Sequence, residues 1–178
     1  MKAGLEDVVA GESGICFIDG SQGILAYRGY NIHELATNST FEETSYLLWF
    51  GRLPNRAELE DTSKTMAAAR AVPPQVLDLM RGLPKTALPM EALRTAVSAL
   101  SMYDSEAEDM SPEANVRKAI RLTAQIPTLV AAFDRLRNGK EPVAPHRDLG
   151  HSANFSLCHF TNSFCSGVAF SHSKYIVL

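Results

Sequence analysis

Residues 31–58, NIHELATNSTFEETSYLLWFGRLPNRAE, carry the signal that decides the fold. At three places a residue that can cap a helix stands three positions ahead of a glutamate: Asn31 before Glu34, Thr40 before Glu43, and Asn55 before Glu58. In such a pair the cap side chain accepts a hydrogen bond from a free backbone amide, and the glutamate accepts one from the amide of the cap residue. Three helix starts in one short stretch predict a mainly helical protein.

The segment after Thr40 is apolar around most of a helical circumference, from Phe41 to Phe50. Gly51 and Pro54 then stop the helix, as glycine and proline commonly do. A helix that is apolar on most sides packs against other elements on most sides. We therefore expect this helix to be mostly buried.

Upstream, residues 14–28, GICFIDGSQGILAYR, have the pattern of two short strands around a turn. The turn DGSQG contains two glycines, which supply the backbone freedom that a tight turn requires. We expect one β-hairpin here and no other sheet in the chain. Cys16 stands among apolar neighbours in the first strand and is interpreted as a small core residue.

Further helices are expected after Asn55, over about residues 56–70, 75–81 and 90–100, because capping residues, glycines and prolines bound each segment. In the third of these, apolar residues recur at intervals of three and four, which is typical of one buried helical face. The predicted buried stripe consists of Met90, Leu93, Val97 and Leu100.

A last, long helix is predicted from Ser111 and Pro112 to about Asn138, with a kink at Pro127. Its predicted inner residues are Ile120, Ile126, Leu129, Val130, Phe133 and Leu136. The preceding residues 104–113 hold five acids and no base, so they are expected to form a solvated loop. The basic residues near the helix start, Arg117, Lys118 and Arg121, are expected to face that loop.

Charge and composition exclude several classes of partner. A formal net charge of −3 and a pI near 5.9 provide no overall positive field for nucleic acid or an anionic membrane. No apolar stretch approaches the roughly 20 residues that span a bilayer, and the first residues lack the pattern of a secretory signal. Three cysteines, an odd number, match no disulfide framework. We expect a soluble protein in the reducing cytoplasm that binds neither nucleic acid nor membranes.

A metal site near the carboxyl end is the first chemical hypothesis. Residues 151–178 hold three of the five histidines and two of the three cysteines: His151, Cys158, His159, Cys165 and His172. Structural zinc sites usually bring ligands in pairs two to four residues apart, and this stretch has no such pair. We interpret these residues as scattered side chains of an irregular segment and expect no metal.

A nucleophile activated by a base is the second hypothesis, with Cys158 or Cys165 beside a histidine. Many proteins contain a cysteine near a histidine in sequence, so the pattern does not favour catalysis here.

The turn around Arg28 is the third hypothesis, since Arg28 can hold a carboxylate or phosphate and His33 can titrate near neutral pH. The structural interpretation is preferred. Gly29 permits a turn from strand to helix, Arg28 pairs with a nearby acid or carbonyl, and His33 lies on the outer face of a capped helix.

Several long blocks of this sequence resemble the citrate synthase family. GILAYRGYNIHELATNSTFEETSYLLWFGRLPNRAEL at 23–59 is similar to its amino-terminal segment. Later blocks are similar to its further landmarks in the same order: PMEALRTAVSAL at 89–100, SPEANVRKAIRLTAQIPTLVAAFDR at 111–135 and DLGHSANF at 148–155. The resemblance covers about residues 4–155 and implies the first part of the family's large helical domain.

The resemblance also implies an enzyme, normally a homodimer, that condenses acetyl-CoA with oxaloacetate and water to give citrate and CoA. In the family an aspartate removes a methyl proton while one histidine stabilises the enol and a second polarises the oxaloacetate carbonyl, and arginines hold its carboxylates. The family motifs that carry these histidines, H-A-D-H-E and H-G-G-A-N, do not occur in this sequence. We therefore assign no catalytic, cofactor-binding or metal-binding residue and expect the 178-residue chain to be inactive alone.

The sequence departs from the family after Phe155. We expect a partial helical domain over 1–155 and an irregular tail unlike the family over 156–178, where Lys174 is the only charged side chain. Three alternatives stay open: a 2-methylcitrate synthase that uses propionyl-CoA, a helical interaction module with a zinc-binding tail, and a chain that associates with a full-length subunit.

Overall fold

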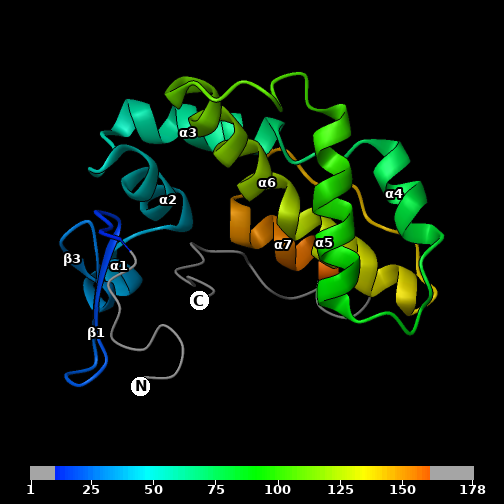
Figure 1. Ribbon diagram of the computed structural model, residues 1–178, viewed down its shortest axis with the longest axis horizontal. Helices are drawn as coiled ribbons and strands as arrows, with labels where there is room; N and C mark the ends of the chain where they lie inside the picture. Colours follow the sequence, from blue (N-terminus) through cyan, green and yellow to red (C-terminus); the bar gives the residue numbers. More distant parts are fainter. Residues whose placement is uncertain (1–10, 161–178) are drawn as a thin grey trace, which may run out of the picture.

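The computed structural model describes residues 11–160 and is mainly helical, as predicted (Figure 1). A small antiparallel sheet comes first and lies at one end of the molecule beside α1 and α2. Its strands are β1 (Cys16–Asp19), β2 (Ile24–Tyr27) and β3 (Tyr30–Asn31). The helices follow in order: α1 (Ile32–Asn38), α2 (Phe41–Phe50), α3 (Arg56–Ala68), α4 (Pro74–Arg81), α5 (Pro89–Leu100), the short 3₁₀ helix η1 (Ser101–Tyr103), α6 (Pro112–Arg137) and α7 (His151–Phe160).

The helix starts predicted from the capping pattern are confirmed. Thr40 at α2 and Asn55 at α3 each form the reciprocal bonds of a capping box with the glutamate three residues later. Asn31 caps α1 as well, but its side chain accepts from the His33 amide rather than from that of Glu34. Local side-chain bonds therefore begin these three helices.

The sheet has one strand more than predicted. Tyr27 pairs with Tyr30 across Arg28 and Gly29, and both of these residues have positive φ, 49° and 88°. Positive φ at both central residues is the mark of a tight two-residue hairpin turn. What was predicted as a strand-to-helix turn is therefore a second hairpin turn. The sequence did not indicate it, because arginine is not a usual residue at the first central position of such a turn.

Cys16 is not a core residue as predicted; it is only half-buried. Its neighbours Phe17 and Ile18 are 61% and 68% exposed. The prediction is wrong because, within residues 11–160, the sheet packs mainly against the short helix α1, at β2 and β3 rather than at β1.

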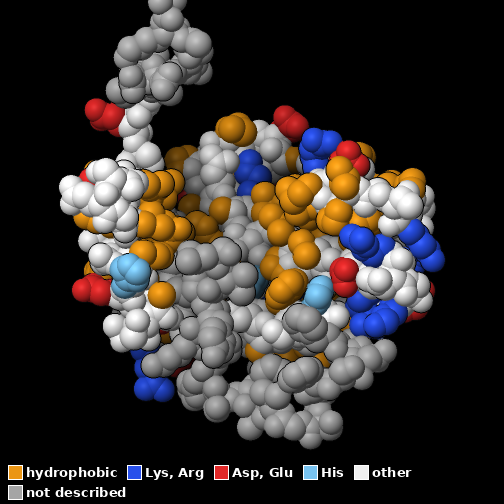
Figure 2. Space-filling model, turned by 90° about the horizontal axis from the view of Figure 1, so that it is seen from below, with side chains coloured by type: hydrophobic (Ala, Val, Ile, Leu, Met, Phe, Trp, Pro, Cys, Tyr) orange, Lys and Arg blue, Asp and Glu red, His pale blue; other side chains and the backbone are white. Residues whose placement is uncertain are grey.

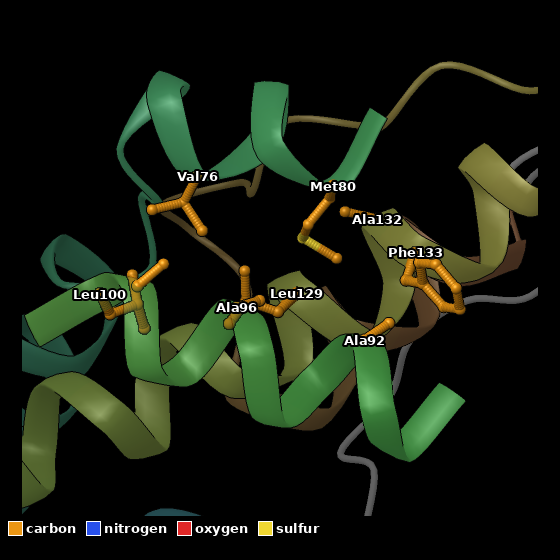
Figure 3. Close-up of a cluster of buried hydrophobic side chains, with 9 residues drawn as sticks. Val76, Met80, Ala92, Ala96, Leu100, Leu129, Ala132 and Phe133 are labelled. Carbon is orange, nitrogen blue, oxygen red and sulfur yellow. The ribbon is translucent and has the colours of Figure 1, made fainter. Parts of the chain in front are cut away.

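The main core lies between α4, α5 and α6 (Figure 3). Val76 and Met80 of α4 point toward α5 and α6, and they share one buried cluster with Leu100 of α5 and Leu129 of α6. Between them lie small side chains, Ala92, Ala96 and Ala132. Small residues let helix backbones approach closely, so alanine takes the positions nearest the neighbouring helix.

The face that α5 buries is therefore turned from the predicted one. Leu100 is buried as expected, but Met90 is 71% exposed, and Leu93 and Val97 are only half-buried. In their place the helix buries Ala92, Ala96 and Ala99. Spacing predicted the helix correctly, whereas close packing of backbones chose alanine over larger side chains.

The other helical predictions are partly confirmed. In α2 the full turn from Thr44 to Leu47 is buried, the other residues are half-buried and Phe50 alone is exposed, at 46%, so the mostly buried helix is confirmed. In α6 Leu129 and Phe133 are buried, the other predicted inner residues are half-buried, and Val130 is 37% exposed. The helix continues through Pro127.

Helix α7 was not predicted and extends the helical part to Phe160, five residues past the predicted boundary at 155/156. Residues 161–178, the greater part of the predicted tail, lie outside the described residues, so the tail stays a prediction. Within residues 11–160, none of the helices combines the length and apolar character needed to cross a bilayer.

Candidate functional site

A buried polar centre lies where α7 meets α2, α3 and α6, and we call it the Arg70 junction. It consists of the side chains of Glu42, Arg70, His151, Asn154 and Cys158 and of the backbone of His146, whose own side chain is exposed. Arg70 follows α3 and is 2% exposed. Its Nη1 donates to two backbone carbonyls in the segment before α7, at 2.8 Å to His146 and 2.7 Å to Leu149.

Arg70 also fixes α6, because its own carbonyl accepts a bond from Thr128 Oγ1 at 3.2 Å. Burial lowers the pKa of Arg70, and the nearby Glu42 carboxylate opposes this shift. An arginine stays charged in proteins even so. One buried cation therefore ties together segments from three parts of the chain.

Glu42 of α2 caps the amino-terminal end of α7. Its Oε1 accepts from the backbone amide of His151 at 2.8 Å, so a carboxylate lies at the positive end of that helix. The His151 imidazole, 6% exposed, stacks on Phe41 with ring centroids 4.2 Å apart. Burial lowers the pKa of His151 to about 4, and Glu42 opposes that shift while Arg70 adds to it. His151 is therefore neutral at neutral pH.

Asn154 completes the junction from inside α7. Its Oδ1 accepts from the His146 amide at 2.7 Å, which fastens the preceding loop to the helix. Cys158 Sγ lies 4.0 Å from the same oxygen, and burial raises the pKa of this thiol.

The Arg70 junction is organised to hold α7 in place. The hydrogen bonds of Arg70, Glu42 and the Asn154 Oδ1 atom run to backbone groups. Cys158 is held as a thiol rather than as a thiolate, the reactive form. Sequence reasoning named His151 and Cys158 but missed Glu42, Arg70 and Asn154. These contacts join residues up to 109 positions apart, so no local pattern could have found them.

The structure describes three of the five candidate metal ligands, His151, Cys158 and His159. Cys165 and His172 lie outside the described residues. Within residues 11–160, no group of three or more His, Cys, Asp or Glu side chains is placed to hold an ion. His159 Nε2 instead lies 3.3 Å from Asp134 Oδ2, and its ring lies against Phe155.

The structure gives Cys158 no features of an activated nucleophile, because a buried thiol with a raised pKa is inert. Cys165, the other candidate nucleophile, lies outside the described residues.

Arg28 has the structural role that was preferred for it. Its guanidinium donates to the carbonyls of Gly14 and Leu48, both at 3.1 Å, and so fastens the sheet to the end of α2. His33 is exposed on α1, as predicted.

The acidic loop before α6 pairs with the basic residues at the start of that helix, as predicted. Arg121 donates to both oxygens of Asp104 at 2.8 Å, and Arg117 Nε donates to Glu106 at 2.8 Å. Bonds from Arg117 and then Arg121 lower the pKa of Glu106. A hollow of about 370 Å³ lies beside this network, but its charged side chains are already paired with one another or with backbone oxygens.

Comparisons with known proteins agree on one family. Residues 4–172 match the family described as "Citrate synthase, C-terminal domain". The chain is 49% identical over 153 residues to citrate synthase 2 of Bacillus subtilis, covering 85% of this chain and 41% of that protein. It is 40% identical over 155 residues to 2-methylcitrate synthase of Mycobacterium tuberculosis, covering 87% and 39%.

A solved structure is similar over the same region. The citrate synthase of Pyrobaculum aerophilum superposes with a TM-score of 0.82 at 42% identity, over 88% of this chain and 41% of that one. The 178 residues thus span about two fifths of the length of the relatives they match.

Proposed function

The chain belongs to the citrate synthase family, and from that premise we propose that it is the amino-terminal part of an acyltransferase that condenses acetyl-CoA with oxaloacetate. Water then releases citrate and CoA from the condensed product. The observation that carries the proposal is the joint agreement of sequence and fold: 49% identity to one relative and a TM-score of 0.82 to another. A cytoplasmic location is part of the proposal, supported by the odd number of cysteines.

We propose further that these 178 residues do not catalyse the reaction by themselves. Removing a proton from a methyl group requires a base within hydrogen-bond reach and a donor placed where the enolate charge develops. The family segments expected to supply them have no counterpart in this sequence. The Arg70 junction does not replace them, because its carboxylate and its guanidinium are bonded to backbone groups.

A 2-methylcitrate synthase is the second candidate, with propionyl-CoA in place of acetyl-CoA. The similarity to the enzyme of that name at 40% identity supports it. One methylene distinguishes the two acyl groups, and a pocket separates such substrates by only about 1–3 kcal/mol.

The test follows CoA release with a thiol reagent in the presence of either acyl-CoA. Because the chain has three cysteines of its own, the rate without oxaloacetate is subtracted. We expect no oxaloacetate-dependent release from the 178-residue chain, whereas a full-length relative under the same conditions gives a clear rate. Turnover by the isolated chain would contradict its proposed inactivity.

A chimaera separates the function from the inactivity. Residues 1–155 are joined to the remaining part of a full-length relative at the equivalent position, and we expect oxaloacetate-dependent CoA release to return. The ratio of the rates with acetyl-CoA and propionyl-CoA is then compared between the chimaera and the unmodified relative. A changed ratio shows that residues 1–155 affect the choice of acyl-CoA. A folded chimaera without activity would argue against the proposed function.

The family homodimer suggests the partner, and we propose that the chain binds a complete synthase subunit. Large apolar side chains are exposed on several elements, among them Met90 at 71%, Leu88 at 63% and Phe17 at 61%. Figure 2 shows apolar side chains gathered in patches on one face, and such patches often mark protein contacts. A tagged 178-residue chain coexpressed with an untagged complete subunit is expected to retain it on an affinity column. Recovery of the tagged chain alone would contradict this association.

A further inference from the structure

An apolar groove of about 370 Å³ lies between α2, α6 and α7. Phe41 of α2 lines it, together with Ile126, Pro127 and Val130 of α6 and Phe155 of α7. Lysine, arginine and acidic side chains are absent from its described lining. Val130 is 37% exposed there, although it lies well inside a long helix. The groove thus leaves apolar surface without a partner among residues 11–160, which is unfavourable in water.

The groove also has one polar requirement. His151 lines it, and the Nδ1 atom of this buried imidazole has no hydrogen-bond partner within residues 11–160. A buried polar atom without a partner costs free energy, so a bond from elsewhere is expected. An occupant that offers apolar side chains together with backbone amides or hydroxyls would meet both requirements.

Residues 161–178 of this chain have that character. Phe164, Val168 and Phe170 are followed by the apolar end Tyr175–Leu178, with Lys174 as the only charge. Thr161, Ser163 and Ser166 supply hydroxyl groups near the start. When a segment with so few charges covers an apolar surface, the free energy falls because apolar groups of both leave water.

The segment after α7 is long enough to reach the groove. Helix α7 has 10 residues and ends at Phe160, so its length is about 15 Å. The following segment reaches up to about 60 Å when extended. Because His151 and Phe155 lie in the first half of α7, the segment needs only to turn back along that helix to reach the groove.

We propose that residues 161–178 bind back into the groove between α2, α6 and α7 and cover Ile126, Val130 and Phe155. This contact would close the apolar surface beside the Arg70 junction. The proposal does not rest on the enzymatic function proposed above, since it concerns how this chain covers its own surface.

Crosslinking in the full 178-residue chain tests the contact directly. Val130 is replaced by the photoreactive residue p-benzoylphenylalanine, and the adduct is located by mass spectrometry. Leu122 provides the matched control, because it lies on the same helix, is also 37% exposed, and lines the hollow beside Arg121 rather than the groove. If the Val130 variant does not fold, the photoreactive residue is moved to Ile126.

We expect the main adduct from position 130 to be intramolecular and to involve a peptide within 161–178, with at least a fivefold excess over position 122. An adduct of twice the chain mass would show that a second copy occupies the groove and would overturn the proposal. Absence of adducts with residues 161–178 would overturn it as well.

A stability comparison in the same chain supports or contradicts the result independently. Val130→Glu is expected to lower the folding equilibrium constant about tenfold, and Leu122→Glu less than threefold. Replacing Phe164, Val168 and Phe170 with serine should remove most of the extra sensitivity at Val130. Equal effects of Val130→Glu with and without these serines would contradict the contact.

Discussion

Replacing Arg70 with methionine is expected to lower the free energy of unfolding by about 3–5 kcal/mol, because two hydrogen bonds from a charged donor are lost and each contributes about 1.5–3 kcal/mol. Methionine has a long apolar side chain but donates no hydrogen bond. The carbonyls of His146 and Leu149 would then lose their donor, and the Glu42 carboxylate would lose its nearby positive charge. Urea unfolding followed by circular dichroism measures the change.

Arg56→Met is the matched control, because the Arg56 side chain is 94% exposed and, within residues 11–160, pairs only with Glu60 one turn further along α3. We expect this variant to lose less than about 0.5 kcal/mol, as exposed ion pairs contribute little. Arg70→Lys should fall between the two arginine variants, since one ammonium cannot reproduce the planar guanidinium. If Arg70→Met and Arg56→Met unfold at the same urea concentration, the role assigned to the Arg70 junction is wrong.

Acidification is expected to destabilise the protein through His151. The pKa of this side chain is about 4 in the fold against an ordinary value of 6.5, so the folded state disfavours its protonated form. The unfolded chain binds the proton first as the pH falls, and stability decreases from pH 6.5 down to about 4. The shift corresponds to about 3 kcal/mol at most. Above pH 6.5 this contribution is fully present.

His151→Phe should remove this pH dependence while keeping a ring to stack on Phe41. The clearest window is between pH 6.5 and 5, because carboxylates with lowered pKa, such as Glu58 at about 2, titrate below it. His33→Phe replaces an exposed histidine of α1 in the same way and is the matched control for the loss of a histidine. An equal loss of stability on acidification in the wild type and in His151→Phe would contradict the assignment.

Short-range signals account for the part of the fold that the sequence predicted. The caps at Thr40 and Asn55, and the capping serine and proline at the start of α6, act within one helical turn, so they can be read from neighbouring letters. The pairing of the acidic loop with Arg117 and Arg121 spans more residues, 11 and 15 from Glu106, but it was still visible because opposite charges stand in adjoining segments. The family resemblance was equally visible in the letters, and comparison with known proteins confirmed it.

Tertiary packing decided what the sequence could not. Helix α7 begins on a carboxylate 109 residues earlier in the chain, and Arg70 bonds a loop 76 residues away. The face of α5 was predicted from apolar spacing, but contact with α4 and α6 buried its alanines in place of Met90. By itself, the sequence therefore determined where the capped helices begin and which family the chain resembles. Only the three-dimensional structure decided which faces are buried and how α7 is held, because these depend on groups that meet only after the chain has folded.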